Sequence, residues 1–284
     1  MGVNKATILI TTGLVAISLV IILAFERKFG SLDVENANSD VKIEKTWELP
    51  DELEEISGFA FVSAVKVACI QDEDGTIFIF NLQTSEIEKE IDFSDSGDYE
   101  GITVKGNTAY VLESNGDIYQ VQDFMNGPEV TKFETRLSSN NDVEGICLDK
   151  SGTRLLMAIK EKDPVAKGYK GIYAFDLNLG KIQKDPAYKI TFEDKVFKDK
   201  SKKEIQDVFK PSEIAIHPSS GEIYLTEGED PQLLILEPTG KVKALYNLNK
   251  SDFPQPEGIA FDPSGNLYIS NEGNPGTIHK VTLK

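Results

Sequence analysis

The sequence predicts an all-β protein, a five-bladed β-propeller that is closed by its own N-terminal strand and preceded by a single transmembrane helix. Three observations support the propeller: a short phrase with a glutamate recurs five times, a strand-like run follows each copy, and turn sequences separate the runs. The copies lie 45, 44, 69 and 44 residues apart. Short strands and turns at this period are typical of propellers with one four-stranded blade per repeat. The recurring glutamates are Glu55, Glu100, Glu144, Glu213 and Glu257.

The first two repeats each divide into four strand-like runs. Apolar and polar residues alternate in 76–80 and 117–121, as expected of strands that pack one face into a core. Turn sequences such as Asp74-Gly75 and Asn115-Gly116 fall between the runs. We therefore expect strands at 56–61, 66–71, 76–82 and 86–93 in the first blade, and at 101–104, 108–113, 117–124 and 129–137 in the second.

The remaining repeats fit three further blades. The third begins at Gly145 and is about 25 residues longer than the others, which is too short for another blade of ~40 residues. We read the surplus as a lysine-rich insertion at about 193–210. The fifth repeat offers only three runs, at 258–261, 266–270 and 276–283, and residues 41–49 can supply the missing strand. Such a strand would close the ring and remove its open edge, so the predicted propeller covers residues 41–284.

The N-terminal region has the pattern of a membrane anchor. Residues 6–25 contain no charged side chain and are rich in Ile, Leu, Val and Ala. At ~1.5 Å per residue, a helix of this length spans a hydrocarbon core of ~30 Å. We expect residues 1–28 to be an uncleaved signal anchor, with a cleaved signal peptide as the alternative, and residues 29–40 to be a flexible tether. We expect the propeller to be exported, because a short N-terminal tail followed by a large domain is the usual layout of a signal anchor. Lys5 before the segment and Arg27 and Lys28 after it favour the opposite orientation.

Composition limits the partners. The formal net charge of −17 argues against nucleic acid, because phosphate binding needs a basic surface, whereas an acidic surface attracts cations. Cys69 and Cys147 stand in apolar runs of different predicted blades, so we read them as buried small side chains, with a disulfide as the alternative. His217 and His279 lack the spacing of a zinc site, and His279 is read as a cross-strand neighbour in the last blade.

Acidic residues are expected to gather at one mouth of the central channel. The first run of each repeat is the innermost strand of a blade, and its start faces the same mouth as the loop between the second and third strands. These loops are residues 72–75, 113–116, 161–163, 227–230 and 271–274, and all are acidic or amide-rich. Lys160 and Lys162 provide the only positive charges there. We therefore expect the five repeated glutamates to occupy equivalent positions at the mouth, with Glu113, Glu227, Asn271 and Glu272 as the second choice of site residues.

This crowding predicts a cation site. Buried carboxylates repel one another unless protons or a cation neutralise them. Calcium suits such a ring, because it accepts six to eight oxygen ligands at roughly 2.3–2.6 Å in flexible geometry, whereas Mg²⁺ requires a tighter octahedron. The predicted cofactor is therefore Ca²⁺, held by some of these residues. The alternative is that each glutamate bonds neighbouring backbone amides and locks one blade to the next.

Several motifs together resemble a known family. They are Glu55-Ile-Ser-Gly with Asp72-Glu73-Asp74-Gly75, Asn141-Asp142-Val143-Glu144-Gly145-Ile146, Lys210-Pro211-Ser212-Glu213-Ile214-Ala215-Ile216-His217-Pro218, and Gln255-Pro256-Glu257-Gly258-Ile259-Ala260-Phe261 with Tyr268-Ile269-Ser270-Asn271-Glu272. They are similar to the SdiA-regulated, YjiK-like propellers of the bacterial envelope. The resemblance implies a five-bladed propeller related to NHL repeats, a calcium site, and in some members an N-terminal membrane segment. It implies no established activity. The fourth repeat departs from the pattern, with Ile214 after its glutamate.

Three functional hypotheses follow. The first is a non-catalytic, calcium-binding module anchored in the bacterial inner membrane by residues 6–25, with the propeller on the periplasmic side and an unknown protein or small-molecule ligand at the channel mouth. The second is a calcium-dependent hydrolase of the lactonase type, in which the metal polarises a carbonyl. Against catalysis, the sequence offers no Gly-x-Ser-x-Gly motif and no evident Ser/His/Asp set. The third makes the lysine-rich insertion a docking loop for an acidic partner or anionic lipid, and its alternative is a solvated insertion with a short helix.

Overall fold

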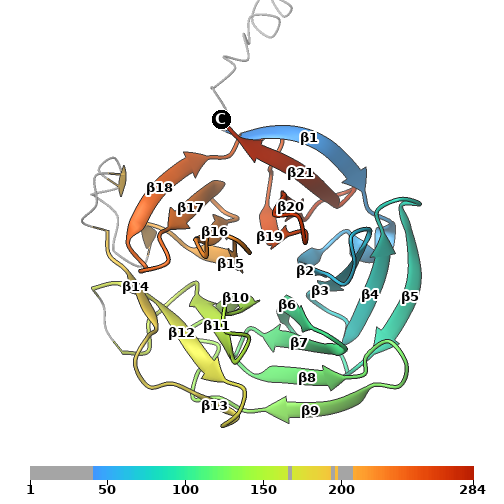
Figure 1. Cartoon of the computed structure of the whole chain (residues 1–284), viewed down its shortest axis with the longest axis horizontal. Coiled ribbons are helices and arrows are strands. Elements are labelled where there is room, and N and C mark those ends of the chain that lie inside the picture. Colours follow the sequence, from blue (N-terminus) through green and yellow to red (C-terminus); the bar gives the residue numbers. More distant parts are fainter. Residues whose placement is uncertain (1–40, 166–167, 193–195, 198–206) are drawn as a thin grey trace, which may run out of the picture. The chain divides into compact units, whose positions relative to one another are not determined.

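Five antiparallel sheets surround one axis and form a five-bladed propeller (Figure 1). The computed structural model describes residues 41–165, 168–192, 196–197 and 207–284. The innermost strands are β2 (Ile56–Phe61), β6 (Tyr99–Lys105), β10 (Val143–Leu148), β15 (Pro211–Ile216) and β19 (Pro256–Phe261). Each innermost strand contacts the next around the ring, and β19 contacts β2. This arrangement confirms the predicted architecture.

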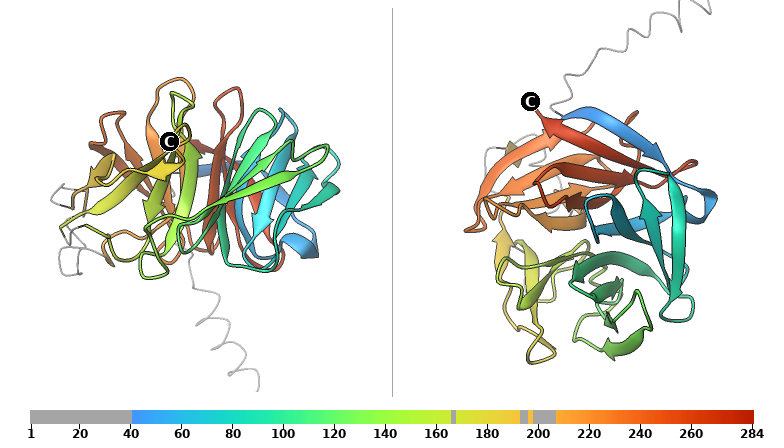
Figure 2. Two further views of the ribbon diagram at one scale, coloured as in Figure 1. Left: turned by 90° about the horizontal axis from the view of Figure 1, so that it is seen from below. Right: turned by 45° about the vertical axis from the view of Figure 1, so that its right-hand side comes forward.

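Each blade adds strands outward from its innermost strand. Blade one continues with β3 (Lys66–Gln71), β4 (Thr76–Asn81) and β5 (Glu86–Asp92), and blade two with β7 (Thr108–Glu113), β8 (Ile118–Gln122) and β9 (Glu129–Phe133). Blade three continues with β11 (Arg154–Ile159) and β12 (Lys170–Asp176), and the outer edge of β12 pairs with both β13 (Lys181–Ile182) and β14 (Tyr188–Ile190). Blade four continues with β16 (Ile223–Glu227), β17 (Gln232–Leu236) and β18 (Val242–Asn247). The strands run between two faces where the connecting loops gather (Figure 2).

The fifth blade is closed by the N-terminal strand, as the sequence predicts. Strand β1 (Val41–Glu48) pairs antiparallel with β21 (Thr277–Leu283), which lies next to β20 (Leu267–Asn271) and β19. The register runs from Val41 opposite Leu283 to Glu48 opposite Thr277. A short 3-10 helix, η1 (Asp51–Leu53), then leads into β2. Because β1 covers the outer edge of β21, the two ends of the propeller are held in one sheet.

Trp47 connects this closing strand to the first blade. Its ring lies 5.8 Å from that of Tyr268, centroid to centroid, and its indole N–H donates a hydrogen bond of 2.6 Å to the carbonyl oxygen of Leu82. On the same strand pair, the Oγ1 of Thr46 lies 2.9 Å from the Nδ1 of His279. His279 is buried and opposes Thr46, so it is the cross-strand neighbour that the sequence suggests. The closure is therefore held by side chains as well as by the strand ladder.

The core consists of apolar side chains packed between neighbouring blades. One cluster joins blade five to blade one and includes Trp47, Phe59, Phe80 and Ile278. Cys69 and Cys147 are buried, unpaired and in different blades, which agrees with their interpretation as small core residues. Burial raises the pKa of both thiols.

Several sequence expectations fall on residues outside the described ranges. They are the membrane segment at 6–25, the tether at 29–40, and Lys195, Lys198, Lys200, Lys202 and Lys203 of the insertion. In the described part of the chain, no helix is long and apolar enough to cross a membrane. Of the insertion, Phe197, Val208 and Phe209 are buried in the cluster that joins blades three and four. These three side chains pack into the core of the propeller.

The closure predicts a large effect of one substitution. Trp47→Ala removes a buried aromatic ring and its hydrogen bond, so we expect the free energy of unfolding to fall by about 3–5 kcal/mol. Trp47→Phe keeps most of the ring and should lose clearly less. Urea unfolding of both variants measures this, and an unchanged midpoint for Trp47→Ala would show that the ring does not depend on this contact.

Candidate functional site

A β-bulge interrupts every innermost strand at the same place, near the channel mouth. The register shifts between Ile56 and Gly58, Tyr99 and Gly101, Val143 and Gly145, Pro211 and Glu213, and Pro256 and Gly258. A bulge leaves one residue out of the ladder and redirects its side chain. The bulged residues are Ser57, Glu100, Glu144, Ser212 and Glu257. In each blade, the bulge therefore redirects one side chain near the channel mouth.

The expectation of five equivalent glutamates holds for three blades and needs correction for two. In blades two, three and five the bulged residue is the repeated glutamate. In blade one, Glu55 precedes the bulged Ser57 by two positions, and in blade four Glu213 follows the bulged Ser212. A shift of one residue along a strand turns the side chain to the other side. For this reason Glu213 does not occupy the position of the other three glutamates. Glu55 differs because it precedes the first residue of β2 and lies outside its ladder.

Glu213 has the locking role that the sequence left as an alternative. Its carboxylate is buried, and its Oε1 accepts hydrogen bonds from the N–H groups of Ile146, at 2.6 Å, and Ile214, at 2.8 Å. A Cβ atom at Gly58 or Gly101 would lie only 3.2 or 3.0 Å from its Oε2. Burial raises the pKa of this carboxyl, while the two N–H donors oppose the shift. Glu213 thus joins blades four and three and lies against the innermost strands of blades one and two.

Four other predicted site residues lie outside the cavity that holds the bulged glutamates. Glu55 is exposed and lines a separate acidic cavity of about 450 Å³ beside η1. Glu113 is paired with Lys132 at 2.9 Å and accepts a hydrogen bond from the hydroxyl of Tyr119 at 3.1 Å. Glu227 and Asn271 are buried at the ends of β16 and β20. None of the four lines the cavity described next.

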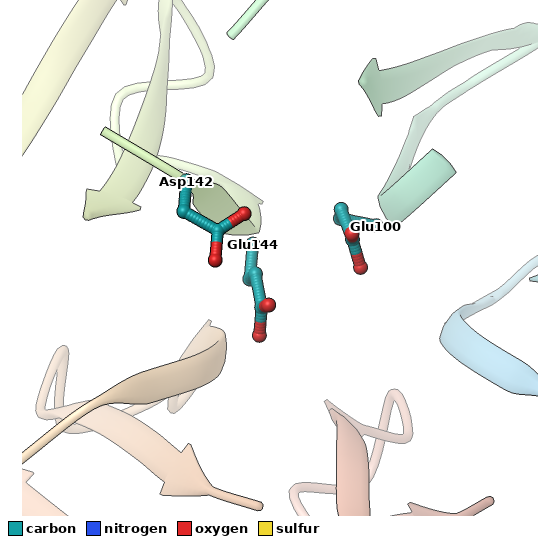
Figure 3. Close-up of side chains that lie close together, drawn as sticks. All are labelled: Glu100, Asp142 and Glu144. Carbon is teal, nitrogen blue, oxygen red and sulfur yellow. The ribbon is translucent and has the colours of Figure 1, made fainter. Parts of the chain in front are cut away.

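A cavity of about 170 Å³, here called the mouth cavity, brings the other four predicted residues together. They are Glu100, Glu144, Glu257 and Glu272, and the remaining lining residues are Ser57, Asp72, Lys160 and Gln255. The tightest group is formed by Glu100, Glu144 and Asp142, which each place one carboxylate oxygen within 4.8 Å of the others. Figure 3 shows these three side chains in the space between blades two and three.

One buried oxygen of this group has no partner in the part of the chain that the structure describes. Glu144 is 4 % exposed, and its Oε1 is paired with the ammonium of Lys160. Its Oε2 is buried and without a hydrogen bond to any described residue, and the same holds for the Oδ1 of Asp72. Unpartnered buried carboxylate oxygens are unfavourable, so they indicate that a further group binds there.

The carboxylates of the mouth cavity hold their protons unusually strongly. Burial raises the pKa of Glu100 to about 8, with the charge of Asp98 adding to the effect. Burial also raises the pKa of Glu257 to about 7, and Glu272 adds to it while Lys160 opposes it. The pKa of Glu144 is raised by burial and by Glu100. Although burial opposes its charge, the carboxylate of Glu144 raises the pKa of Lys160. Among the described residues, the cavity therefore contains one ammonium, that of Lys160, and several carboxylates that it does not fully neutralise.

The residue types fit a hard cation. The side chains grouped with Glu144 are the carboxylates of Glu100 and Asp142, and oxygen is the ligand atom that Ca²⁺ prefers. Asp142 was not among the predicted site residues, although it stands two positions before Glu144. Its φ of 51° lies in the left-handed region, which Asp adopts more readily than most residues. Asp72 belongs to a loop that is acidic in sequence. Asp142 and Asp72 could therefore have been found from their positions beside the predicted glutamates and loops.

The opposite end of the channel has a different character. A cavity of about 270 Å³ there is lined mainly by apolar side chains at the ends of the innermost strands, such as Phe61, Val104, Ile216 and Phe261. His217 follows β15 at this end, with its ring 4.9 Å from that of Phe261. The cavity at this end thus has one acidic lining residue, Asp262, whereas the mouth cavity has several, and neither histidine lines the mouth cavity.

The raised pKa values predict the pH dependence of stability without added cations. Because the folded pKa values of Glu100 and Glu257 lie above the ordinary value of 4.5, their contribution to stability is complete below about pH 4.5 and is lost as pH rises through about 7–8. In EDTA, we expect the free energy of unfolding to fall between pH 5 and 8 by up to about 1.4 kcal/mol per pH unit for each carboxyl. Urea unfolding across this range should give a smaller slope for Glu100→Gln. Equal slopes would show that this carboxyl titrates normally.

The locking role of Glu213 predicts a loss of stability that is independent of cations. Glu213→Ala leaves the N–H groups of Ile146 and Ile214 without an acceptor, so we expect a loss of at least about 2 kcal/mol. Glu213→Gln should lose less, because its amide oxygen can still accept. Thermal unfolding in EDTA and in excess Ca²⁺ should give the same difference from the wild type, and a difference confined to Ca²⁺ would make Glu213 a cation ligand.

Solved structures provide fold relatives at low sequence identity. Glutaminyl cyclase from Myxococcus xanthus is similar with a TM-score of 0.60 and 15 % identity, over 86 % of this chain and 96 % of that one. A protein of unknown function from Bacteroides thetaiotaomicron gives 0.51 and 13 %, over 81 % of this chain and 58 % of that one. A streptogramin B lyase gives 0.49 and 14 %, over 86 % and 98 %. At these identities the likeness concerns the fold alone.

Sequence comparison identifies the family. No curated protein matches the chain. The family model described as SdiA-regulated matches residues 34–277, which is most of the chain. This match agrees with the resemblance seen in the repeated motifs and with the five-bladed fold. The chain therefore belongs to the SdiA-regulated family.

Proposed function

We propose that this protein is a calcium-binding propeller that serves as a non-catalytic binding module at the bacterial cell envelope. One observation carries the proposal: Glu144, whose buried Oε2 has no partner among the described residues, forms a carboxylate group with Glu100 and Asp142. A buried carboxylate group of this kind is stabilised by a cation that satisfies its free oxygens.

Calcium is the cation that the donor set favours. Glu100, Asp142 and Glu144 would hold it, with Asp72, Glu257 and Glu272 across the mouth cavity as further oxygen donors. These donors come from different blades, and this suits the variable coordination of Ca²⁺ better than the strict octahedron of Mg²⁺. Zinc is disfavoured because no histidine or cysteine is among the described residues that line the mouth cavity. When bound, the cation would supply positive charge that neutralises the crowded carboxylates and a Lewis-acidic centre at the mouth.

A binding role agrees with the position of the cavity. The mouth cavity lies where the innermost strands begin, at the face that also carries the loops between the second and third strands of the blades. Loops on a rigid scaffold are common binding surfaces. A protein segment or a small molecule with an oxygen ligand could complete the coordination of the cation. The envelope location rests on residues 6–25, which we propose as a membrane anchor that leaves the propeller on the periplasmic side.

A calcium-dependent hydrolase of the lactonase type is the second candidate. The cation would polarise the carbonyl of the substrate, and a cavity carboxylate would have to act as the base. His279 is enclosed in blade five and His217 lies at the opposite end of the channel, so neither can take that part. Hydrolysis of simple lactones by the calcium-loaded protein, lost in Glu144→Gln, would favour this candidate over the binding module.

The calcium site predicts a selective gain of thermal stability. After EDTA treatment, Ca²⁺ at a hundred times its dissociation constant should stabilise the protein by about 2.7 kcal/mol, seen as a rise in melting temperature. Glu144→Gln should abolish the rise because it removes a ligand charge. Glu113→Gln is the matched control, since Glu113 is paired with Lys132 outside the mouth cavity, and it should keep the rise.

Two results would contradict the proposal. One is the absence of any shift with Ca²⁺, and the other is an equal shift with Mg²⁺ that survives in Glu144→Gln. The glutamates would then be structural, and a ligand would have to be sought at the loops.

A further inference from the structure

Lys160 occupies the place where a bound cation would neutralise Glu144. It follows β11, and its ammonium forms an ion pair with the Oε1 of Glu144. The side chain of Lys160 is 23 % exposed, while that of Glu144 is 5 % exposed. Among the described residues that line the mouth cavity, Lys160 is the only one with a positive charge. The protein therefore supplies its own counter-ion to the buried carboxylates.

The backbone of Lys160 is fixed while its side chain is the part that reaches the cavity. Its N–H donates to the carbonyl oxygen of Asp142 at 2.8 Å, and its carbonyl oxygen accepts a hydrogen bond from the ammonium of Lys170. Lys170 is 1 % exposed and also donates to the carbonyl oxygen of Glu161 at 2.9 Å. These bonds hold the start of the loop after β11 in place, so rotation about the side-chain bonds of Lys160 can move its ammonium without moving the loop.

A second cavity adjoins the mouth cavity and offers the ammonium another position. Its volume is about 190 Å³, and it shares Lys160, Gln255 and Glu257 with the mouth cavity. It adds the side chain of Lys250 and the carboxylate of Glu229, which is paired with Lys210 at 3.3 Å. Gly228 leaves room for the side chain of Glu257 there, since a Cβ atom at Gly228 would lie 2.5 Å from its Oε1. After leaving Glu144, the ammonium of Lys160 would face the carboxylate of Glu229 there and share it with Lys210.

We propose that Lys160 is a displaceable counter-ion that competes with calcium for Glu144 and sets the affinity of the site. The proposal rests on the calcium site proposed above. An ammonium and a divalent cation next to the same carboxylate repel each other strongly in a buried site, so calcium binding requires Lys160 to turn away from Glu144 and toward Glu229 in the second cavity. Lys160 lowers the affinity of the site for cations and keeps Glu144 neutralised when calcium is scarce.

The test compares two lysine variants of the full chain. Lys160→Met keeps most of the side-chain volume, removes the charge, and introduces a soft sulfur that Ca²⁺ does not favour. Lys162→Met is the matched control, because Lys162 is exposed, lies in the same loop and does not line either cavity. Calorimetric titration with CaCl₂ should show binding to Lys160→Met that is tighter by at least about tenfold, or ~1.4 kcal/mol, with Lys162→Met close to the wild type.

Three outcomes of the titration have different meanings. Tighter binding by Lys160→Met supports the proposal. Weaker or unchanged binding overturns it and makes Lys160 a residue that positions Glu144 for the cation. No calcium binding by any of the three proteins overturns the proposed calcium site, and the competition with it.

A second measurement uses the wild-type protein, so its result does not depend on whether the Lys160→Met variant folds. Amine-reactive labelling, read by mass spectrometry at each lysine, should increase at Lys160 when Ca²⁺ is added, because its ammonium leaves a buried ion pair. Lys162 should stay reactive and Lys170 should stay protected in both conditions. Reduced labelling of Lys160 on addition of Ca²⁺ would contradict displacement.

Discussion

The pairing of β1 with β21 is the constraint on which the rest of the molecule depends. It joins residues from the two ends of the propeller in one sheet, and Trp47 links that sheet to blade one through Leu82 and to its own blade through Tyr268. Only a closed ring brings the starts of all five innermost strands to one channel mouth. The mouth cavity uses residues from blades one, two, three and five, so its geometry would be lost in an open ring.

The bulges then determine which charged side chains face the channel mouth of the closed ring. Each bulge removes one residue from the ladder, and three of the five bulged residues are glutamates. In blade four the equivalent residue is Ser212, whose hydroxyl donates to the carbonyl oxygen of Pro256 at 2.6 Å, and the neighbouring Glu213 bonds backbone N–H groups instead. The repeated glutamate thus joins neighbouring blades in blade four, whereas in blade three it leaves a carboxylate oxygen without a partner among the described residues. The difference comes from one residue of register, because that decides which side of the strand a side chain faces.

Local sequence patterns were enough to predict the fold. They were not enough to predict where individual carboxylates lie. Strands β2, β3 and β7 begin and end where alternation and turn residues predict, since these signals act over a few residues. The bulge position depends on pairing with the neighbouring strand, so Glu55 looks equivalent to Glu100 in sequence while Ser57 holds that position. Asp142 joins the group through a left-handed backbone conformation that the sequence pattern does not specify. The ion pair of Lys160 depends on contacts between different strands of blade three, and this is visible only once the blade is folded.

The contrast between Lys170 and Lys160 explains how a strongly acidic protein can keep buried carboxylates and remain folded. Lys170 is surrounded by backbone carbonyl oxygens, and burial lowers its pKa to about 8, so its role is to hold the loop. Lys160 faces the carboxylates of the mouth cavity, which raise its pKa, so it remains charged and balances part of their repulsion. One lysine cannot neutralise three neighbouring carboxylates. The carboxylates that it leaves unneutralised either take up protons or bind a cation. A net charge of −17 raises the local concentration of cations around such a site, which favours the second possibility as pH rises.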